Sequence, residues 1–352
     1  MDFQPDWQMF EAAVRNRRPA RLPLHEHIIS PTVMERITGV RFADLRQGGA
    51  ADLAEFFRQY CGFFRAMTYD VVSYEVCITE VLPGSGAISG GMAGPIQNGR
   101  DLAAYPWDRL PALFWEKAAP RFAALAAALP PGMRAAGGVG NGVFEIAEDL
   151  VGLEYLPFLE VDDPAAYAEL FRRIGDLMHT IWGEFLKRHA VHFAACRFGD
   201  DLGFKTSLLT HPRTFHDHIA PQYKRIIDLV HAHGRPFLWH SCGCIFDLMN
   251  AAIGLGIDAK HSNEDAIAPF DTWIERYGGR IGLLGGFDMD FLCQSRPAEV
   301  RARVIERGTR YRAAAQGYAL GSGNSIPDYV PAANYLAMVE GARVIREREG
   351  TA

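Results

Sequence analysis

The run His240-Ser241-Cys242 places an imidazole and a thiol two residues apart at the end of a short apolar stretch. Because side chains alternate across a strand, both groups would face the same side and could bind the same ion. Zinc binds histidine nitrogen and cysteine sulfur, and Glu264, after the next predicted strand, adds a carboxylate oxygen. Three protein ligands and one open position are typical of a catalytic zinc site. The same pattern also fits a buried cysteine beside a hydrogen-bonded histidine.

Polar side chains also stand at the ends of other predicted strands. His25 and His27 alternate along one strand and fit a substrate-binding or acid–base role, or that of hydrogen-bonded strand-end histidines. Asp200 and Asp201 fit either a carboxylate pair or a helix cap, and we favour Asp201 for chemistry. Asn324 lies in a glycine-rich turn. Further strand-end polar residues are Tyr74, Glu75, Asn141, Glu145 and His261.

Eight short β-type runs carry these residues. They cover residues 22–29, 69–82, 133–140, 192–201, 236–243, 256–262, 280–288 and 317–324. Between them, apolar residues recur every three or four positions, as expected of amphipathic helices, at 163–189, 213–234, 297–315 and 332–347. Alternating strands and helices indicate parallel strands with crossover helices. Eight such units predict an α/β protein with a (β/α)8 TIM barrel, which would bring the carboxyl ends of its strands to one pocket.

The chain shows no boundary between domains. Because no repeat or polar linker divides it, we expect one domain over residues 1–352, with 1–20 as an N-terminal helical extension. An open doubly wound sheet would need a glycine-rich turn after its first strand, but GGVGNG at 137–142 follows the third and lacks the GxGxxG spacing. Pro221 should kink the helix predicted at 213–234 or mark its true start.

Composition excludes several classes of protein. With 49% hydrophobic and 22% charged residues, the chain is neither disordered nor a collagen or coiled coil. The 36 basic and 42 acidic residues give a net charge of −6, which argues against nucleic-acid and anionic-membrane partners. The N-terminus lacks the layout of a signal peptide, and the six cysteines are too sparse for a disulfide framework. We therefore expect a cytoplasmic location.

The chain resembles the uroporphyrinogen decarboxylase superfamily, and within it the zinc-containing, corrinoid-dependent methyltransferases. The resemblance runs from PLHEHI to the C-terminal helix and rests on GDDLGFKTSLL at 199–209, HSCG at 240–243, GGFD at 285–288 and GYALGSGNSIPDYVP at 317–331. It implies a TIM barrel of the uroporphyrinogen decarboxylase type and zinc bound by His240, Cys242 and Glu264. In those methyltransferases a second cysteine follows strand eight, and here Asn324 stands at that position.

The exchange of cysteine for Asn324 changes the expected chemistry. Zinc with one thiolate and one carboxylate is formally neutral, and it is a stronger Lewis acid than zinc with an additional thiolate. Such a centre favours activation of a methylated ether, amine or thioether over alkylation of a thiol. Two other roles remain open for Asn324, that of a weak carbonyl ligand and that of a hydrogen-bond donor to substrate without any metal.

The same family layout implies further pocket residues. It places Lys205 and Asp288 in the pocket, where the alternative is an ion pair between loops. Trp239, Phe287 and Tyr318 are predicted to line a flat apolar cavity for a corrin or an aromatic substrate, and ordinary core packing is the alternative.

These expectations describe an enzyme that moves a methyl group between a small methylated substrate and a corrinoid (cobalamin) with zinc activation. Because the chain has no second domain to hold the corrinoid, a separate corrinoid protein is the expected partner. One alternative is a decarboxylase-like lyase that acts without metal, although the first strand lacks the arginine-bearing motif that would bind porphyrinogen carboxylates. A second alternative is a non-catalytic tetrapyrrole-binding barrel. Homo-oligomer formation is left open.

Overall fold

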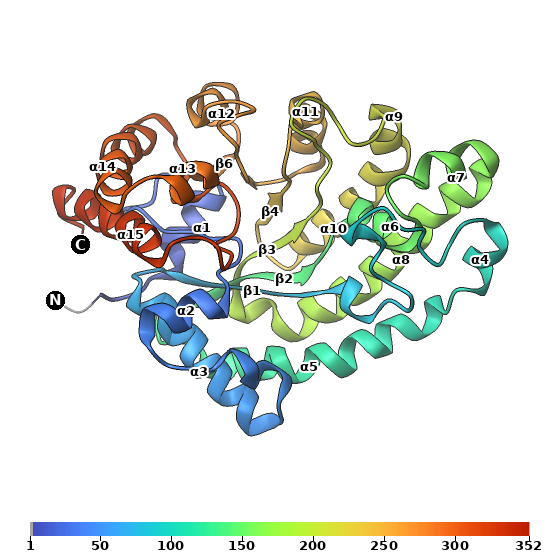
Figure 1. The fold of residues 1–352 in the computed structure, drawn as a ribbon, viewed down its shortest axis with the longest axis horizontal. Coiled ribbons are helices and arrows are strands. Elements are labelled where there is room, and N and C mark those ends of the chain that lie inside the picture. Colours follow the sequence, from blue (N-terminus) through green and yellow to red (C-terminus); the bar gives the residue numbers. More distant parts are fainter. Residues whose placement is uncertain (1–2, 352) are drawn as a thin grey trace.

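The computed structural model of the chain describes residues 3–351. Its centre is one parallel sheet of seven strands whose spatial order follows the chain, and helices surround the strands (Figure 1). The strands are β1 (Val71–Cys77), β2 (Arg134–Gly140), β3 (Phe193–Gly199), β4 (Phe237–His240), β5 (Ala259–His261), β6 (Gly282–Phe287) and β7 (Tyr318–Ser322). Each lies within a run predicted from the sequence, so the α/β class and the parallel order are confirmed.

The helices fill the connections between strands. The α-helices are α1 (Trp7–Val14), α2 (Pro31–Thr38), α3 (Ala50–Ala66), α4 (Gly99–Ala104), α5 (Leu110–Ala128), α6 (Val143–Val151), α7 (Leu156–Asp162), α8 (Pro164–His189), α9 (Pro212–Thr214), α10 (Ala220–Ala232), α11 (Phe246–Leu255), α12 (Phe270–Tyr277), α13 (Met289–Gln294), α14 (Pro297–Ala314) and α15 (Ala332–Arg348). Short 3₁₀ turns lie at Ala43–Gln47, Ile78–Val81, Ala87–Ser89, Trp107–Arg109 and Ala190–His192.

Three of the predicted amphipathic segments are continuous helices, α8, α14 and α15. The fourth is broken, because a π-helical segment at Phe215–Ile219 separates α9 from α10. Pro221 lies in the first turn of α10, where its missing N–H costs no helical hydrogen bond, so it marks the start of that helix. Among the described residues, no helix combines the length and the apolar character needed to cross a membrane.

The predicted first strand, residues 22–29, is not formed as a strand, so the closed eight-stranded barrel is not confirmed. This segment forms two isolated bridges, from Leu24 to Leu320 of β7 and from Ile29 to Ile326, four residues beyond the end of β7. Toward β1, Ser73 Oγ donates a hydrogen bond to the carbonyl oxygen of His27, and His27 Nε2 lies 4.0 Å from Glu75 Oε1. Pro23 has no N–H to donate to a ladder, which is one physical reason for the interruption.

Helix α1 lies against the amino-terminal ends of the strands. Asp6 caps it by accepting a hydrogen bond from Gln8 N. Its buried residues Phe10, Ala13 and Val14 join a cluster of small side chains from the interior of the sheet, Val71, Ala136, Ala194, Ala195, Leu238, Ala259, Leu284 and Ala319. The helix expected within residues 1–20 therefore seals one end of the sheet, which leaves the carboxyl ends of the strands as the open end.

The strand register brings three site positions into one row. Gly199 on β3 pairs with His240 on β4, and His240 pairs with His261 on β5. Along β4, Leu238 belongs to the interior cluster, whereas Trp239 belongs to the core between sheet and helices. Because side chains alternate along a strand, His240 faces the interior like Leu238.

Candidate functional site

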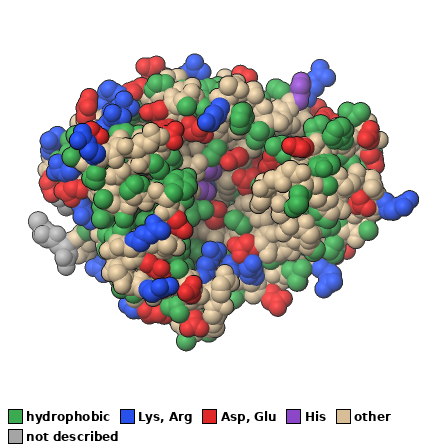
Figure 2. All heavy atoms as spheres, in the orientation of Figure 1, with side chains coloured by type: hydrophobic (Ala, Val, Ile, Leu, Met, Phe, Trp, Pro, Cys, Tyr) green, Lys and Arg blue, Asp and Glu red, His purple; other side chains and the backbone are tan. Residues whose placement is uncertain are grey.

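A polar hollow lies at the open end of the sheet. Figure 2 shows histidine and acidic side chains gathered in a depression at the centre of this face. Gly199 leaves part of this space free, since a Cβ atom there would stand 3.5 Å from His240 Cδ2 and 3.6 Å from Glu145 Oε1. The hollow is thus bounded by a histidine on one side and by a carboxyl group on the other.

Asp201, His240 and Cys242 form a cluster whose ligand atoms all lie within 4.8 Å of one another. His240 Nε2 is 3.5 Å from Cys242 Sγ. In a tetrahedral zinc site, bonds of about 2.0 Å to nitrogen and about 2.3 Å to sulfur put these two atoms about 3.5 Å apart. Asp201 also fixes the loop after β4, because its Oδ1 accepts a hydrogen bond from Cys242 N over 2.8 Å. The donor set and its spacing therefore fit zinc.

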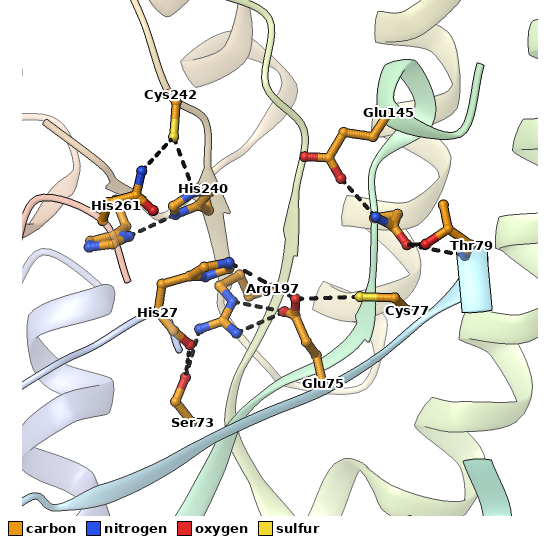
Figure 3. Close-up of polar contacts among 12 residues, drawn as sticks. His27, Ser73, Glu75, Cys77, Thr79, Glu145, Arg197, His240, Cys242 and His261 are labelled. Carbon is orange, nitrogen blue, oxygen red and sulfur yellow. Dashed lines mark hydrogen bonds and ion pairs between the residues drawn. The ribbon is translucent and has the colours of Figure 1, made fainter. Parts of the chain in front are cut away.

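A chain of hydrogen bonds fixes the tautomer of His240 (Figure 3). His261 Nε2 lies 3.1 Å from the carbonyl oxygen of Ser322, which can only accept, so this nitrogen carries a hydrogen. Burial lowers the pKa of His261 to about 3, so its ring is neutral and its Nδ1 accepts. His240 Nδ1, 2.8 Å away, must then donate to it. The lone pair of His240 is left on Nε2, which faces Cys242.

A second group, His27, His240 and His261, also brings its nitrogen atoms within 4.8 Å of one another. The rings of His27 and His240 are stacked, with centroids 3.8 Å apart and planes 14° apart. A ring nitrogen binds a metal through a lone pair in the ring plane, so two face-to-face rings direct their lone pairs side by side rather than at one ion. We therefore favour the cluster that contains Cys242.

Two donors point at the sulfur of Cys242. Ser262 Oγ lies 3.4 Å from Sγ and Asn324 Nδ2 lies 3.3 Å from it. In the metal-free protein burial raises the pKa of Cys242, and the nearby Asp201 carboxylate raises it further. Metal binding requires the thiolate, so it would release this proton.

Carboxyl groups from α6 and from the loop after β3 line the side of the hollow opposite His240. The pKa of Glu145 is raised well above its usual value by burial and by the charges of Asp200 and Asp201. Asn141 Nδ2 donates to Glu145 Oε2 over 2.9 Å and so holds it in place. Burial likewise raises the pKa of Glu148 to about 8. Both shifts favour the protonated form of these carboxyl groups.

Asp200 has a structural role. Its carboxylate accepts hydrogen bonds from Phe144 N and Glu145 N, at 3.0 and 2.8 Å, and from Tyr223 Oη at 2.5 Å. It therefore caps the first turn of α6 and orients Glu145. The helix-cap alternative for the pair Asp200 and Asp201 applies to Asp200, whereas Asp201 faces the cluster.

A buried ion pair lies beneath His27. Arg197 donates to Glu75 Oε2 through Nε at 3.2 Å and Nη2 at 2.8 Å, and to Ser73 Oγ through Nη1 at 2.9 Å. His27 Nε2 stands 4.0 Å from Glu75 Oε1. Burial and the positive charge of Arg197 lower the pKa of His27, so its ring is neutral. Because Arg197 is paired with Glu75, its guanidinium group is not free to bind an anionic substrate.

The structure places other predicted residues away from the cluster. Glu264 is not a member of either metal-ligand group, and Asp201 stands in its place. Lys205 is exposed on the loop after β3. Asp288 caps α13 by accepting from Asp290 N and Phe291 N, and it also accepts from Asp265 N. His25 is fully buried below the site, where its ring stacks on Phe10.

The three aromatic residues predicted to line a cofactor cavity lie in the core between the sheet and the helices. Trp239 packs near Tyr223 of α10, and Phe287 packs near Tyr311 of α14. Tyr318 packs on the same Tyr311 and donates to the carbonyl oxygen of Gly285. Strand alternation explains this placement, because the rule that turns His240 inward turns Trp239 outward.

Sequence reasoning gave no role to His261 and did not single out Arg197, Lys260 or Ser262. A signal existed for Arg197 and Lys260, because each interrupts a short apolar strand, and such cations are rarely buried without a partner. Lys260 Nζ lies 3.9 Å from the Trp273 ring centroid, and burial lowers its pKa to about 7. Ser262 carries no sequence signal, since its importance comes from its backbone conformation.

The chain is similar in sequence to one protein family and in fold to several solved structures. The model of the uroporphyrinogen decarboxylase (URO-D) family matches residues 125–344. The fold is similar to that of a methyltransferase from Methanosarcina mazei, with a TM-score of 0.70 and 13% identity over 97% of this chain and 99% of that chain. More distant similarities include xylanase B from Clostridium stercorarium, with a TM-score of 0.43 and 10% identity over 82% and 99% of the two chains. No curated protein matches this chain in sequence.

Proposed function

The chain belongs to the uroporphyrinogen decarboxylase family, and we propose that this member transfers a methyl group between a small methylated substrate and a corrinoid, with zinc held by Asp201, His240 and Cys242. The M. mazei protein with the similar fold is a methyltransferase, which supports the reaction class. The substrate class is a methylated ether, amine or thioether, in keeping with a formally neutral zinc centre.

The observation that carries this proposal is the fixed tautomer of His240. Its Nε2 lone pair faces Cys242 Sγ at the separation that zinc needs, and the Nδ1 hydrogen bond to His261 prevents the ring from turning. An unused strand-end histidine would have no need for such a support. This support favours a cation site that is preformed before substrate arrives.

Zinc bound here would act as a Lewis acid that draws electron density from the heteroatom carrying the methyl group. Around it, the chain supplies space and a proton. Gly199 leaves room between His240 and Glu145 for a small substrate. Glu145, whose pKa is raised by burial and by the charges of Asp200 and Asp201, would give its proton to the heteroatom as the methyl group leaves without the bonding electron pair. Those electrons would stay on the heteroatom, and the electron pair for the new bond to carbon would have to come from the corrinoid of the partner.

The charges around the hollow weigh against decarboxylation of a substrate with several carboxylates. Arg197 is paired with Glu75, and the ammonium of Lys260 is directed at the Trp273 ring and the carbonyl oxygen of Ser262. Asp201 adds an acidic group beside His240 and Cys242. Burial of several carboxylates without paired cations would be costly.

The proposal assigns the corrinoid to a separate protein. The aromatic side chains expected to form a corrin cavity, Trp239, Phe287 and Tyr318, are buried in the core. A planar tetrapyrrole would have to approach the hollow from its open side, which is the side that a partner can reach.

The first test is the metal content of protein purified without added metal, followed by zinc titration of the apoprotein. We expect about one zinc per chain, and we expect His240→Ala and Cys242→Ala to lose it while circular dichroism stays unchanged. Protein that takes up no zinc on titration would refute the metal site.

The second test mixes the zinc protein with reduced cobalamin and a set of methylated ethers, amines and thioethers. Methyl transfer changes the absorption spectrum of the cobalt chromophore, which gives a direct readout. Formation of coproporphyrinogen from uroporphyrinogen would favour the lyase alternative, and binding of cobalamin without turnover of any methyl donor would favour the tetrapyrrole-binding alternative.

A further inference from the structure

Ser262, directly after β5, has a backbone conformation that is rare for a residue with a side chain. Its φ is +100°, and it is only 3% exposed. Such a conformation is strained for any residue but glycine, and it persists only where the surroundings enforce it. Strain of this kind beside a cluster of ligand side chains calls for a functional explanation.

Several contacts enforce this conformation. Lys260 Nζ, two residues earlier, donates to the carbonyl oxygen of Ser262. The ammonium group is held in turn over the Trp273 ring, 3.9 Å from the centroid. On the other side, Asn263 N donates to the carbonyl oxygen of Gly323 over 2.9 Å, and Asn263 Oδ1 accepts from Gly286 N over 2.9 Å. Residues 262 and 263 are thus fixed by β5 itself, by β6 and by the turn after β7.

The result of this conformation is the direction of the Ser262 hydroxyl. Oγ donates to Cys242 Sγ over 3.4 Å, and Asn324 Nδ2 donates to the same sulfur over 3.3 Å. Sulfur is a weak acceptor when it is a thiol and a much better one when it is a thiolate. Two hydrogen bonds on one sulfur therefore match the charged, metal-binding form of Cys242. They also withdraw electron density from it, which makes it a weaker donor to a metal.

We propose that Ser262 is a positioning residue whose backbone conformation Lys260 holds in place. The Ser262 hydroxyl weakens electron donation from Cys242 to the bound metal. This strengthens the Lewis acidity of the metal centre. This inference rests on the proposed zinc site. It assigns Lys260 an indirect role, because its ammonium contacts the carbonyl oxygen of Ser262 and no ligand atom. The two residues therefore act as one unit on the sulfur.

The test uses Co²⁺ in place of zinc, because the thiolate-to-cobalt charge-transfer band reports how strongly the sulfur donates. Wild-type apoprotein is titrated with Co²⁺ and the position of this band is recorded. Ser262→Ala removes the hydroxyl but keeps the strained backbone, and Ser262→Gly removes both. We expect both variants to shift the band to longer wavelength by a similar amount and to change Co²⁺ affinity about 10-fold.

Lys260→Met tests whether Lys260 holds the backbone of Ser262 in its strained conformation. It should shift the band in the same direction as Ser262→Ala, and the double variant should shift it no further than Ser262→Ala alone, because the lysine acts only through the serine. If Lys260→Met does not fold, Lys260→Leu, which also removes the donor and the charge, answers the same question. Ser325→Ala is the matched control, since this serine lies in the turn of Asn324 and donates no hydrogen bond to Cys242 among the described residues.

The outcomes separate this inference from the proposed function. A wild-type protein that binds no Co²⁺ refutes the metal site and this inference together. A wild-type protein that binds Co²⁺, with an unchanged band in both Ser262 variants or in the Lys260 variants, refutes the positioning role alone and leaves the metal site standing.

Discussion

The side-chain amide of Asn324 donates a hydrogen bond to Cys242 Sγ over 3.3 Å, although 82 residues separate the two in the chain. The turn after β7 therefore reaches the end of β4. A side chain at position 324 is therefore close enough to act on the metal that we propose, either as a donor to the Cys242 thiolate or, when exchanged, as a ligand itself.

Asn324→Cys should add a second thiolate to the site. Zinc should bind more tightly, and the centre should become more anionic and a weaker Lewis acid. We expect slower removal of a methyl group from an ether or amine and faster alkylation of a thiol, measured as separate half-reactions on the cobalt chromophore. Asn324→Ala is the control and should keep zinc on three protein ligands. Unchanged zinc affinity in the cysteine variant would show that position 324 does not reach the ion.

His261→Ala should weaken zinc binding about 10- to 100-fold, because it removes the acceptor that holds the His240 hydrogen on Nδ1. His261→Asn, which offers a carbonyl acceptor on a shorter side chain, should recover part of the loss. Zinc affinity is measured by competition with a chromophoric chelator. His179→Ala, a histidine on α8 far from the hollow, serves as the control and should bind zinc like the wild type. Equal affinities for all variants would contradict the support role of His261.

The Glu148 carboxyl predicts a pH dependence of stability. Burial raises its folded-state pKa to about 8 from a usual value of 4.5. Between these pH values the native protein keeps a proton that the unfolded chain has released, so the free energy of unfolding falls as pH rises, by about 1 kcal/mol per pH unit. The free energy of unfolding of Glu148→Gln should equal that of the wild type at pH about 5 and exceed it at pH about 8.

Urea denaturation of both proteins across this pH range checks the prediction. Glu154→Gln, an exposed glutamate three residues beyond α6, should leave the pH profile unchanged. Parallel profiles for wild type and Glu148→Gln would mean that the Glu148 carboxyl is ionised in the native protein.

Gly199→Ala should lower activity without loss of fold. The new methyl group would lie at ordinary contact distances, 3.5 Å from His240 Cδ2 and 3.6 Å from Glu145 Oε1, so no neighbour has to move. It would occupy the space in which we place the substrate. We expect unchanged Tm and zinc content but a reduced kcat/KM. Gly62→Ala on α3, where nothing lies within 4 Å of the new atom, is the control. Full activity of Gly199→Ala would move the substrate elsewhere.

Period-two alternation and chain order are local properties, and they sufficed for much of the fold and part of the site. They located seven of the strands and put His240 and Cys242 on one side of β4. The same alternation turns Trp239 to the face opposite His240, so it argues against Trp239 as a pocket residue. The prediction for Trp239 failed because alternation was applied to His240 but not to the residue before it. Residues 22–29 show the limit for strands, because pairing depends on partners as well as on residue type.

The sequence by itself determined the residue types of the metal-binding motif, the nearness of Asn324 to it and the order of the parallel strands. Only the tertiary structure decided that Asp201, and not Glu264, lies with its ligand atom within 4.8 Å of those of His240 and Cys242, because the loop paths after β3 and β5 set which carboxylate comes near them. It also decided the tautomer of His240 and the strained backbone of Ser262. Both depend in part on contacts of β5 and the residues after it with β6, β7 and the turn after β7, and such contacts leave no pattern in the local sequence.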